Sequence, residues 1–247
     1  MAIIEIKDLR KTYKLGNERV HALKKINLCI EKGEICCVLG TSGSGKSTLL
    51  NMLAGLEKPT HGSVIIKGTE ITKLSEKKLA KFRQEYLGFV FQSYNLLNQL
   101  TALENVAMPL MFKGVPRKRR EKIAEKMLKN VGLDNRMKHK PSQMSGGQQQ
   151  RVGIARAFVT KPAVIFADEP TGNLDSHTTE DVMKLMVRMC RKYHLTLVLV
   201  THDLGISQYA DKIVHIIDGE ITSVEANISK YDLDKMKEDE RTDNDEK

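Results

Sequence analysis

The stretch that decides the fold is Gly40–Thr48, "GTSGSGKST". It fits the pattern G-x-x-x-x-G-K-[ST], follows the apolar run "EICCVLG" and opens a helical pattern. Glycines let the backbone curl so that several N–H groups point inward, and the helix start adds its positive end. The sequence therefore predicts a phosphate-binding loop (P-loop) made of Gly40, Thr41, Ser42, Gly43, Ser44, Gly45, Lys46, Ser47 and Thr48. Lys46 would charge-pair with phosphates, and Ser47 would offer a hydroxyl to Mg²⁺.

Around this loop, two kinds of apolar run predict two kinds of strand. "EICCVLG", "GFVFQ", "AVIFAD" and "LTLVLVT" are dense and favour buried, mostly parallel strands. "AIIEI", "HALKKINLCI" and "SVIIKG" favour an antiparallel sheet. Predicted helices lie between them at Lys46–Leu56, Pro116–Val131, Gly147–Val159 and Thr178–Tyr193. Strands alternating with helices indicate an α/β fold with crossover connections.

One long segment and the C-terminus depart from this alternation. No dense strand occurs from 93 to 160, which predicts a helical subdomain within a domain spanning 1–225. Inside it, the basic run Arg117–Arg120 fits either a solvated helix face or a contact with anionic lipid or a partner. Residues 226–247 carry five basic and eight acidic side chains, which predicts a charged, flexible C-terminal tail.

Composition sets broader bounds. The chain has 247 residues, of which 40% are apolar and 29% charged, as expected for a globular protein. The net charge is +9, and without the tail's −3 the body carries +12. Such a charge favours nucleic acid, anionic lipid or nucleotide without choosing among them. No apolar run is long enough to span a bilayer, and the first residues lack a signal-peptide layout, so we expect the protein to remain in the cytosol.

The cysteines Cys29, Cys36, Cys37 and Cys190 have no metal-site spacing. Cys36 and Cys37 are adjacent in a predicted strand, so their side chains should point to opposite faces of the sheet. We interpret them as small buried residues in a reducing compartment.

Polar residues end three of the dense runs. In "AVIFADEP", Asp168 is placed to hold Mg²⁺ and Glu169 to accept a proton from water as general base. His202 ends "LTLVLVTH" and could cap the strand, but in this company it is expected to contact the γ-phosphate. Gln92 ends "GFVFQ" and can reach the metal or the attacking water.

Taken together, "GTSGSGKST", Gln92, "MSGGQ", "AVIFADEP", "NLD" and His202 resemble, in kind and order, the motifs of ATP-binding-cassette (ABC) ATPases. The resemblance extends to about Val224 and implies a P-loop NTPase with a RecA-like core, an antiparallel β subdomain and an α-helical subdomain. It implies ATP and Mg²⁺ as ligands. Tyr13 matches the aromatic residue that stacks on adenine, and Val20 would pack nearby.

"MSGGQ" looks like a second anion-binding helix start. Ser145 is a good N-cap, and Gly146 and Gly147 leave N–H groups unshielded before Gln148. In the family, this signature caps the ATP held by the P-loop of a second copy, so the resemblance implies an ATP-dependent head-to-tail homodimer. Asp175 matches the loop that crosses the dimer seam. The first signature position, usually leucine, is Met144 here, and we expect little effect because the volumes are similar.

The stretch "FVFQSYNLLNQLTALENVAMPLMFKGV" is most similar to cassettes of lipoprotein-release, macrolide-export and antimicrobial-peptide systems, the LolD and MacB types. This resemblance implies an integral membrane permease partner that docks near Gln92–Glu104, and a place at the cytoplasmic face of the cell membrane. It also fits an FtsE-like cell-division regulator that moves no substrate. A soluble cassette acting on nucleic acid or ribosomes is a third reading. Neither a second cassette copy nor a coiled-coil or zinc insert is present, so no nucleic-acid partner is expected.

Overall fold

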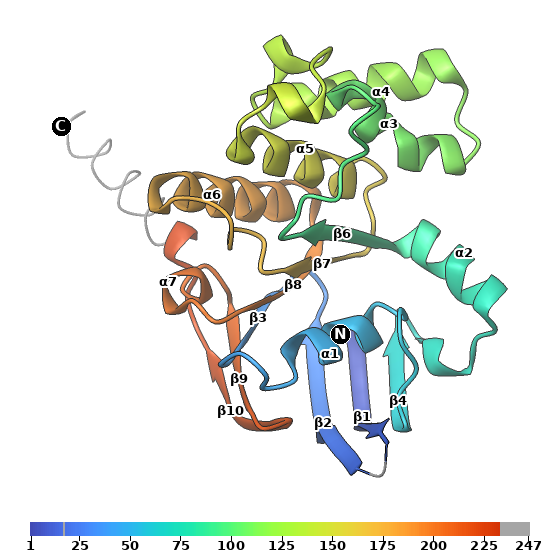
Figure 1. Ribbon diagram of the computed structural model, residues 1–247, viewed down its shortest axis with the longest axis vertical. Helices are drawn as coiled ribbons and strands as arrows, with labels where there is room; N and C mark the ends of the chain where they lie inside the picture. The colour runs from blue at the N-terminus through green and yellow to red at the C-terminus, as the bar shows by residue number, and fades with distance from the viewer. Residues whose placement is uncertain (17, 233–247) are drawn as a thin grey trace.

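The computed structural model describes residues 1–16 and 18–232, which form two sheets and their covering helices (Figure 1). The larger sheet has six strands in the order β10-β9-β3-β8-β7-β6. Its strands are β3 (Ile35–Leu39), β6 (Leu87–Phe91), β7 (Val164–Asp168), β8 (Thr196–Thr201), β9 (Lys212–Ile217) and β10 (Glu220–Ala226). All neighbours are parallel except β9 and β10. The four dense apolar runs are the adjacent strands β3, β8, β7 and β6. Strands β9 and β10 were not predicted from the sequence, and they are only partly buried.

The smaller sheet is antiparallel, with the order β2-β1-β4-β5. It consists of β1 (Ala2–Leu15), β2 (Glu18–Glu31), β4 (His61–Ile66) and β5 (Thr69–Glu70). All three sparse apolar runs fall in this sheet, as the sequence predicts. Its long β1–β2 hairpin contributes buried side chains such as Ile4, Leu9 and Ile26 to one core.

Seven α-helices are described, three more than the sequence predicts. They are α1 (Lys46–Leu53), α2 (Glu76–Tyr86), α3 (Ala102–Phe112), α4 (Arg117–Asn130), α5 (Gly146–Phe158), α6 (Ser176–Tyr193) and α7 (Leu204–Ser207), with 3₁₀ turns at Ile71–Lys73, Asp134–Arg136 and Pro141–Gln143. Of the additional helices, α2 buries only Leu79 and Phe82, α3 contains Pro109, and α7 has only four residues. Among the described residues, 93–160 contain helices α3 to α5 and no strand.

Two hydrophobic cores lie on the two faces of the larger sheet. One packs α3, α4, α5 and α6 against the sheet, and the other joins it to α1 and the antiparallel sheet (Figure 1). Cys37 belongs to the first core and Cys36 to the second, so the two thiols point to opposite faces as predicted. Within the described ranges, no helix is both long and apolar enough to cross a membrane.

Residues 227–232 continue from β10 along α7. Ser229 is 1% exposed and its hydroxyl donates to the Tyr209 carbonyl at 2.8 Å. The Asp232 carboxylate accepts a hydrogen bond from Arg191 at 2.7 Å. The first residues of the predicted tail are therefore held against the domain, whereas 233–247 lie outside the described residues.

Parallel register brings the functional candidates to one edge of the sheet. Leu39 pairs with Thr201, and Asp168 pairs with Val200. The P-loop, the Asp168–Glu169 pair and His202 therefore all follow the carboxyl ends of adjacent strands, where ligands bind in open α/β sheets.

Thiol chemistry tests this burial. Burial raises the pKa of the Cys36 and Cys190 thiols to about 12 and also raises that of Cys37, while Cys29 is exposed. A pKa three units above normal leaves about a thousandfold less thiolate at pH 8. We expect native protein to gain one adduct rapidly with an aromatic disulfide reagent, and denatured protein to gain four, as counted by mass spectrometry. A Cys29→Ser variant should lose the rapid adduct; a second fast-reacting thiol in the native protein would contradict the described packing.

Candidate functional site

The P-loop packs so closely against neighbouring strands that two of its glycines have no room for a side chain. At Gly40, an added Cβ would lie 2.3 Å from the Ile216 carbonyl oxygen, and at Gly45 it would lie 2.6 Å from the Ala22 carbonyl oxygen. Gly45 also has φ 100°, which side chains rarely allow, and it caps α1 without any side-chain hydrogen bond. The first N–H groups of α1 are therefore free of a side-chain cap, as a phosphate-binding helix start requires.

The loop borders a cleft of about 840 Å³ that Gln92, Glu169 and His202 also line. Lys46 is only 7% exposed, and its ammonium donates to the Thr41 carbonyl at 2.7 Å. The buried Ser44 hydroxyl has no hydrogen-bond partner among the described residues. A buried cation and a buried orphan hydroxyl beside curled backbone match the oxygens of a polyphosphate.

Ser47 and Asp168 form the pair expected for a divalent cation. The Ser47 hydroxyl donates to Asp168 Oδ1 at 3.3 Å. Burial raises the pKa of Asp168, an effect that the Ser47 hydrogen bond opposes. Hard oxygen donors of this kind suit Mg²⁺, which keeps several waters and takes its other ligands from phosphates. Within the described ranges, no cluster of three or more His, Cys, Asp or Glu residues could hold a metal ion by itself. A metal ion bound here would therefore need ligands from phosphate and water.

Glu169 is held in a constrained position at the end of β7. Its φ is 44°, in the left-handed region, a strained conformation that functional sites often retain. One carboxylate oxygen lies 2.9 Å from Nδ1 of His202, and the other accepts a hydrogen bond from Thr201 at 3.2 Å. The Glu169 side chain is 18% exposed and that of His202 67%. The two predicted catalytic residues therefore meet, with Thr201 as an orienting partner that the sequence analysis missed.

Gln92 is linked to the loop after β7. Its amide Nε2 donates to Asn173 Oδ1 at 3.3 Å, and Asn173 Nδ2 donates back to the Gln92 carbonyl at 3.1 Å. An added Cβ at Gly172 would lie 2.7 Å from the same Nε2 atom. Asn173 belongs to the "NLD" stretch, and the adjacent Gly172 was the signal in the sequence for this close approach.

Tyr13 lies beside the end of the P-loop. Its hydroxyl donates to Glu57 at 2.8 Å and is also within hydrogen-bonding reach of Thr48. The Lys11 ammonium pairs with Glu57 at 2.6 Å and sits 5.0 Å from the Tyr13 ring centroid. Burial, followed by the Glu57 hydrogen bond, raises the pKa of Tyr13. Val20 is the cross-strand neighbour of Tyr13 and is 43% exposed, so the pair presents an apolar surface near the loop.

The second helix start is organised differently from the first. Ser145 is the N-cap of α5, and its hydroxyl accepts the Gln148 N–H at 3.4 Å while the Gln148 side chain accepts the Ser145 N–H at 3.1 Å. This reciprocal arrangement is a capping box. The Ser145 hydroxyl proton is still available to an external anion, because the cap uses the oxygen only as an acceptor.

Both signature glycines are required by packing. An added Cβ at Gly146 would lie 2.8 Å from the Tyr94 hydroxyl, and one at Gly147 would lie 2.5 Å from Thr178 Cγ2. Thr178 is fixed in turn by Asp175, which caps α6 and accepts hydrogen bonds from the Thr178 N–H and hydroxyl. These two hydrogen bonds lower the pKa of Asp175. Asp175 therefore supports the signature helix within its own chain.

The chain does not bring its two helix starts together. Ser145, Gly147 and Gln148 line a separate cavity of about 370 Å³ that shares no residue with the P-loop cleft. The helices α1 and α5 pack on opposite faces of the six-stranded sheet (Figure 1). An anion held by the P-loop is consequently out of reach of the same chain's signature.

Comparisons with known proteins agree with this geometry. Residues 23–172 match the family described as ABC transporter. The chain is 44% identical over 223 residues to the lipoprotein-releasing system ATP-binding protein LolD of Pseudomonas fluorescens, covering 90% of this chain and 98% of that protein. A dimeric post-hydrolysis structure of the ATP-binding cassette MJ0796, bound to ADP and phosphate, has a TM-score of 0.84 at 44% identity, covering 90% of this chain and 98% of that one. MJ0796 comes from Methanocaldococcus jannaschii.

The chain is also 46% identical over 219 residues to the macrolide export ATP-binding/permease protein MacB of Vibrio parahaemolyticus. That match covers 89% of this chain but only 33% of the MacB protein. The chain therefore spans about a third of the length of this relative.

The Gly147 contact generates a stability test. We expect Gly147→Ala to force its Cβ against Thr178 Cγ2 and to lower the free energy of unfolding by about 1–3 kcal/mol, as overpacking commonly does. Urea unfolding followed by circular dichroism measures this change.

Thr178→Ser is the matched background, because it removes Cγ2 and keeps the hydroxyl that binds Asp175. In this background, Gly147→Ala should be neutral or stabilising by up to about 1 kcal/mol, since alanine is the better helix former. The double-mutant cycle should then give a coupling energy of about 1 kcal/mol or more. Additive effects would mean that the Gly147–Thr178 contact does not limit this site.

Proposed function

This chain belongs to the ABC transporter family, and we propose that it binds and hydrolyses ATP to drive a partner membrane subunit of the lipoprotein-release or macrolide-export type. The observation that carries the proposal is one cleft with a complete set of groups. It holds the P-loop with Lys46, and the Ser47–Asp168 pair and the Glu169–His202 pair meet beside that loop.

In the proposed reaction, a water oxygen attacks the γ-phosphorus and the bond to the β–γ bridging oxygen breaks. Glu169 accepts the proton that the water loses, from a position fixed by Thr201 and His202. His202 contacts the γ-phosphate, and Lys46 stabilises the charge that develops on the phosphate oxygens. When bound, Mg²⁺ would further stabilise the negative charge of the phosphate oxygens, and Ser47, Asp168 and Gln92 would hold it.

We further propose that Tyr13 stacks on the adenine ring. The Lys11 ammonium lies over the Tyr13 ring, 5.0 Å from the ring centroid, and the Tyr13 hydroxyl donates a hydrogen bond to Glu57. The ring is therefore oriented before ligand arrives, which lowers the entropic cost of stacking. Val20 would be covered by the nucleotide.

The separation of the two helix starts supports a shared site between two copies. The Ser145–Gln148 signature of one copy would cap the γ-phosphate held by the P-loop of the other, adding about half a positive charge at the helix start. The related cassette MJ0796 is dimeric in a post-hydrolysis structure bound to ADP and phosphate. Asp175 would lie at the seam between the copies, where its cap of α6 keeps Thr178 against Gly147.

A groove beside Gln92 supports a membrane partner. It has a volume of about 740 Å³ and is lined by Phe89, Phe91, Asn95, Met108, Phe112 and Arg156, among others. Phe112 is 64% exposed and Leu56, which also lines the groove, is 54% exposed, so the groove offers two large apolar side chains to a partner. We propose that a cytoplasmic segment of the permease subunit docks here and holds the cassette at the cytoplasmic face of the membrane.

The catalytic assignment is tested with Glu169→Gln. The amide keeps the shape of the side chain but cannot accept the proton, so we expect ATP affinity to be retained and ATP turnover to fall by about a hundredfold or more. With hydrolysis blocked, saturating MgATP should produce a stable dimer in light scattering. Lys46→Ala is the control for binding and should lose nucleotide affinity.

The double variant Glu169→Gln/Ser145→Arg separates catalysis from sharing of the site. The arginine side chain would obstruct the signature of each copy without touching its own P-loop, so a single copy should still bind ATP and no dimer should form. A trapped dimer in this double variant would contradict a shared site, whereas full turnover by the Glu169→Gln single variant would contradict the role of Glu169.

Partner docking is tested with Phe112→Asp, in the groove. We expect it to abolish co-purification with a membrane subunit from detergent extracts and to leave ATP binding unchanged. Val224→Asp is the matched control, because Val224 is 49% exposed on β10 and does not line the groove. Equal co-purification by wild type and Phe112→Asp would place the partner elsewhere.

A further inference from the structure

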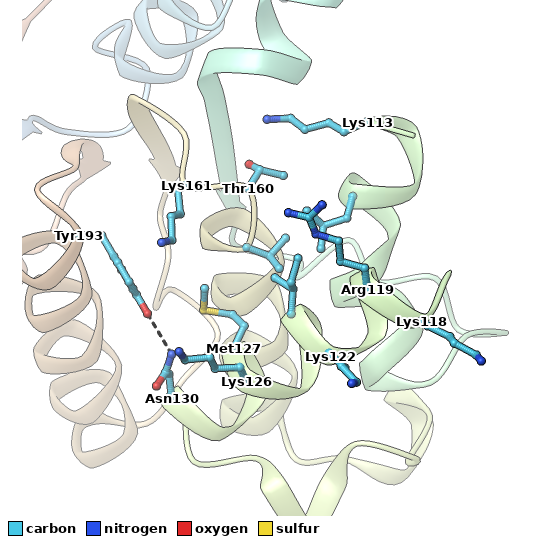
Figure 2. A pocket seen from close by; sticks show the side chains of 13 residues that line it. Lys113, Lys118, Arg119, Lys122, Lys126, Met127, Asn130, Thr160, Lys161 and Tyr193 are labelled. Carbon is cyan, nitrogen blue, oxygen red and sulfur yellow. Dashed lines mark hydrogen bonds between the residues drawn. The ribbon is translucent and has the colours of Figure 1, made fainter. Parts of the chain in front are cut away.

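A basic cavity lies away from the P-loop cleft and next to the partner groove, with which it shares Thr160. It is a cavity of about 730 Å³ between the end of α3, the outer face of α4, the Thr160–Lys161 linker and the end of α6. Figure 2 shows Lys113 and Arg119 on one side of it and Lys161 and Tyr193 on the other, with Lys118 and Lys122 pointing outward from α4. We refer to it as the cationic cavity.

Six cations line this cavity and no acid does. They are Lys113, Lys118, Arg119, Lys122, Lys126 and Lys161. None of the six forms an ion pair with a described residue, although Arg117 at the start of the same helix pairs with Glu121. The acidic residues of α4, Glu121 and Glu125, are not among the lining residues. This surface therefore has a concentrated positive charge, and none of its six cations is paired with a carboxylate of the described residues.

The floor of the cavity is apolar and rigid. It is formed by Leu110, Ile123, Met127, Val159 and Tyr193. The Tyr193 hydroxyl accepts a hydrogen bond from Asn130 Nδ2 at 2.9 Å, which fixes the ring at the edge of the cavity (Figure 2). A solvated helix face would not need such a floor, whereas an acidic peptide with interspersed apolar groups would fit both the floor and the rim.

The C-terminal part of this chain has that chemistry. Glu238–Glu246 contains six acidic residues and one basic residue, and Leu233 and Met236 precede it. The chain leaves the described part at Asp232, whose carboxylate is held by Arg191 on α6 at 2.7 Å. Tyr193, at the edge of the cavity, is only two residues further along α6.

We propose that Glu238–Glu246 docks in the cationic cavity of its own chain. The five residues 233–237 can span up to about 17 Å, which exceeds the diameter of about 10–12 Å of a helix such as α6 with its side chains. Six carboxylates would then face six cations, and the basic run Arg117–Arg120 would contribute through Lys118 and Arg119.

The tether favours this occupant over other anions. A short covalent linker gives the acidic run an effective concentration in the millimolar range near the cavity. A separate acidic protein or an anionic membrane has to compete with that concentration. The docked segment would connect α4 to the linker before β7, and its binding would weaken as salt rises.

The proposal is tested by carbodiimide cross-linking of the full chain, which joins carboxylates to lysines only at direct contact. At about 0.01 M salt, mass spectrometry should find cross-links from Glu238–Glu246 to Lys113, Lys122 and Lys161. They should fall at least about fivefold at about 1 M salt, where screening is strong. A mixture of ¹⁴N- and ¹⁵N-labelled chains should give links within one chain only.

Two variants probe the two partners. Lys118→Glu/Lys122→Glu/Lys126→Glu should reduce the remaining links to Lys113 and Lys161 by about fivefold or more. The matched control Lys77→Glu/Lys78→Glu/Lys81→Glu, on the exposed face of α2, should leave them unchanged. On the other side, Glu238→Gln/Asp239→Asn/Glu240→Gln should reduce links from Asp243, Asp245 and Glu246.

Three results would overturn the proposal. The first is the absence of these links at low salt in the wild-type chain. The second is links that occur only between differently labelled chains, which would assign the cavity to a second copy. The third is a free acidic run together with sedimentation on phosphatidylglycerol vesicles that the α4 variant loses, which would assign the cavity to a membrane surface.

Discussion

The structure depends on one feature, the close packing of the P-loop against the backbone of β9 and of β2. Gly40 has no room for a side chain beside the Ile216 carbonyl, and Gly45 has none beside the Ala22 carbonyl. This packing fixes the start of α1 at the carboxyl edge of the six-stranded sheet. Because β7 and β8 are in parallel register with β3, Asp168, Glu169 and His202 emerge at the same edge. A loop with side chains would separate these groups from the phosphate site.

The N–H groups at the start of α1 and at the start of α5 have no partner within their own helix, and the two helices differ in how these groups are satisfied. The start of α1 has no side-chain cap, which leaves its N–H groups to a ligand that stays with the chain. The start of α5 is closed by the Ser145–Gln148 capping box, which keeps the helix formed when no anion is present. An exposed signature that meets its ligand only intermittently needs such a cap. Asp175 and Thr178 add support from α6.

Most of the strands and helices could be predicted from the sequence. Strands β3, β6, β7 and β8 and the antiparallel sheet followed from the density and spacing of apolar residues. Helices α2 and α3 and the strands β9 and β10 did not, because α2 buries only two side chains, α3 is interrupted by Pro109, and β9 and β10 are only partly buried. Most P-loop residues, Gln92, Glu169 and His202 line one cleft, Asp168 is linked to it by its hydrogen bond with Ser47, and the signature residues line a separate cavity.

By itself, the sequence determined the motifs, since each is a contiguous stretch whose backbone chemistry acts locally. Only the tertiary structure decided which distant residues meet. Gln92 binds Asn173, Lys11 and Glu57 orient Tyr13, and Lys161 and Tyr193 complete a cavity begun by α4. Such contacts depend on how helices and sheets pack across the two cores. They could not be predicted because packing is set by shape complementarity among many residues and not by any local pattern.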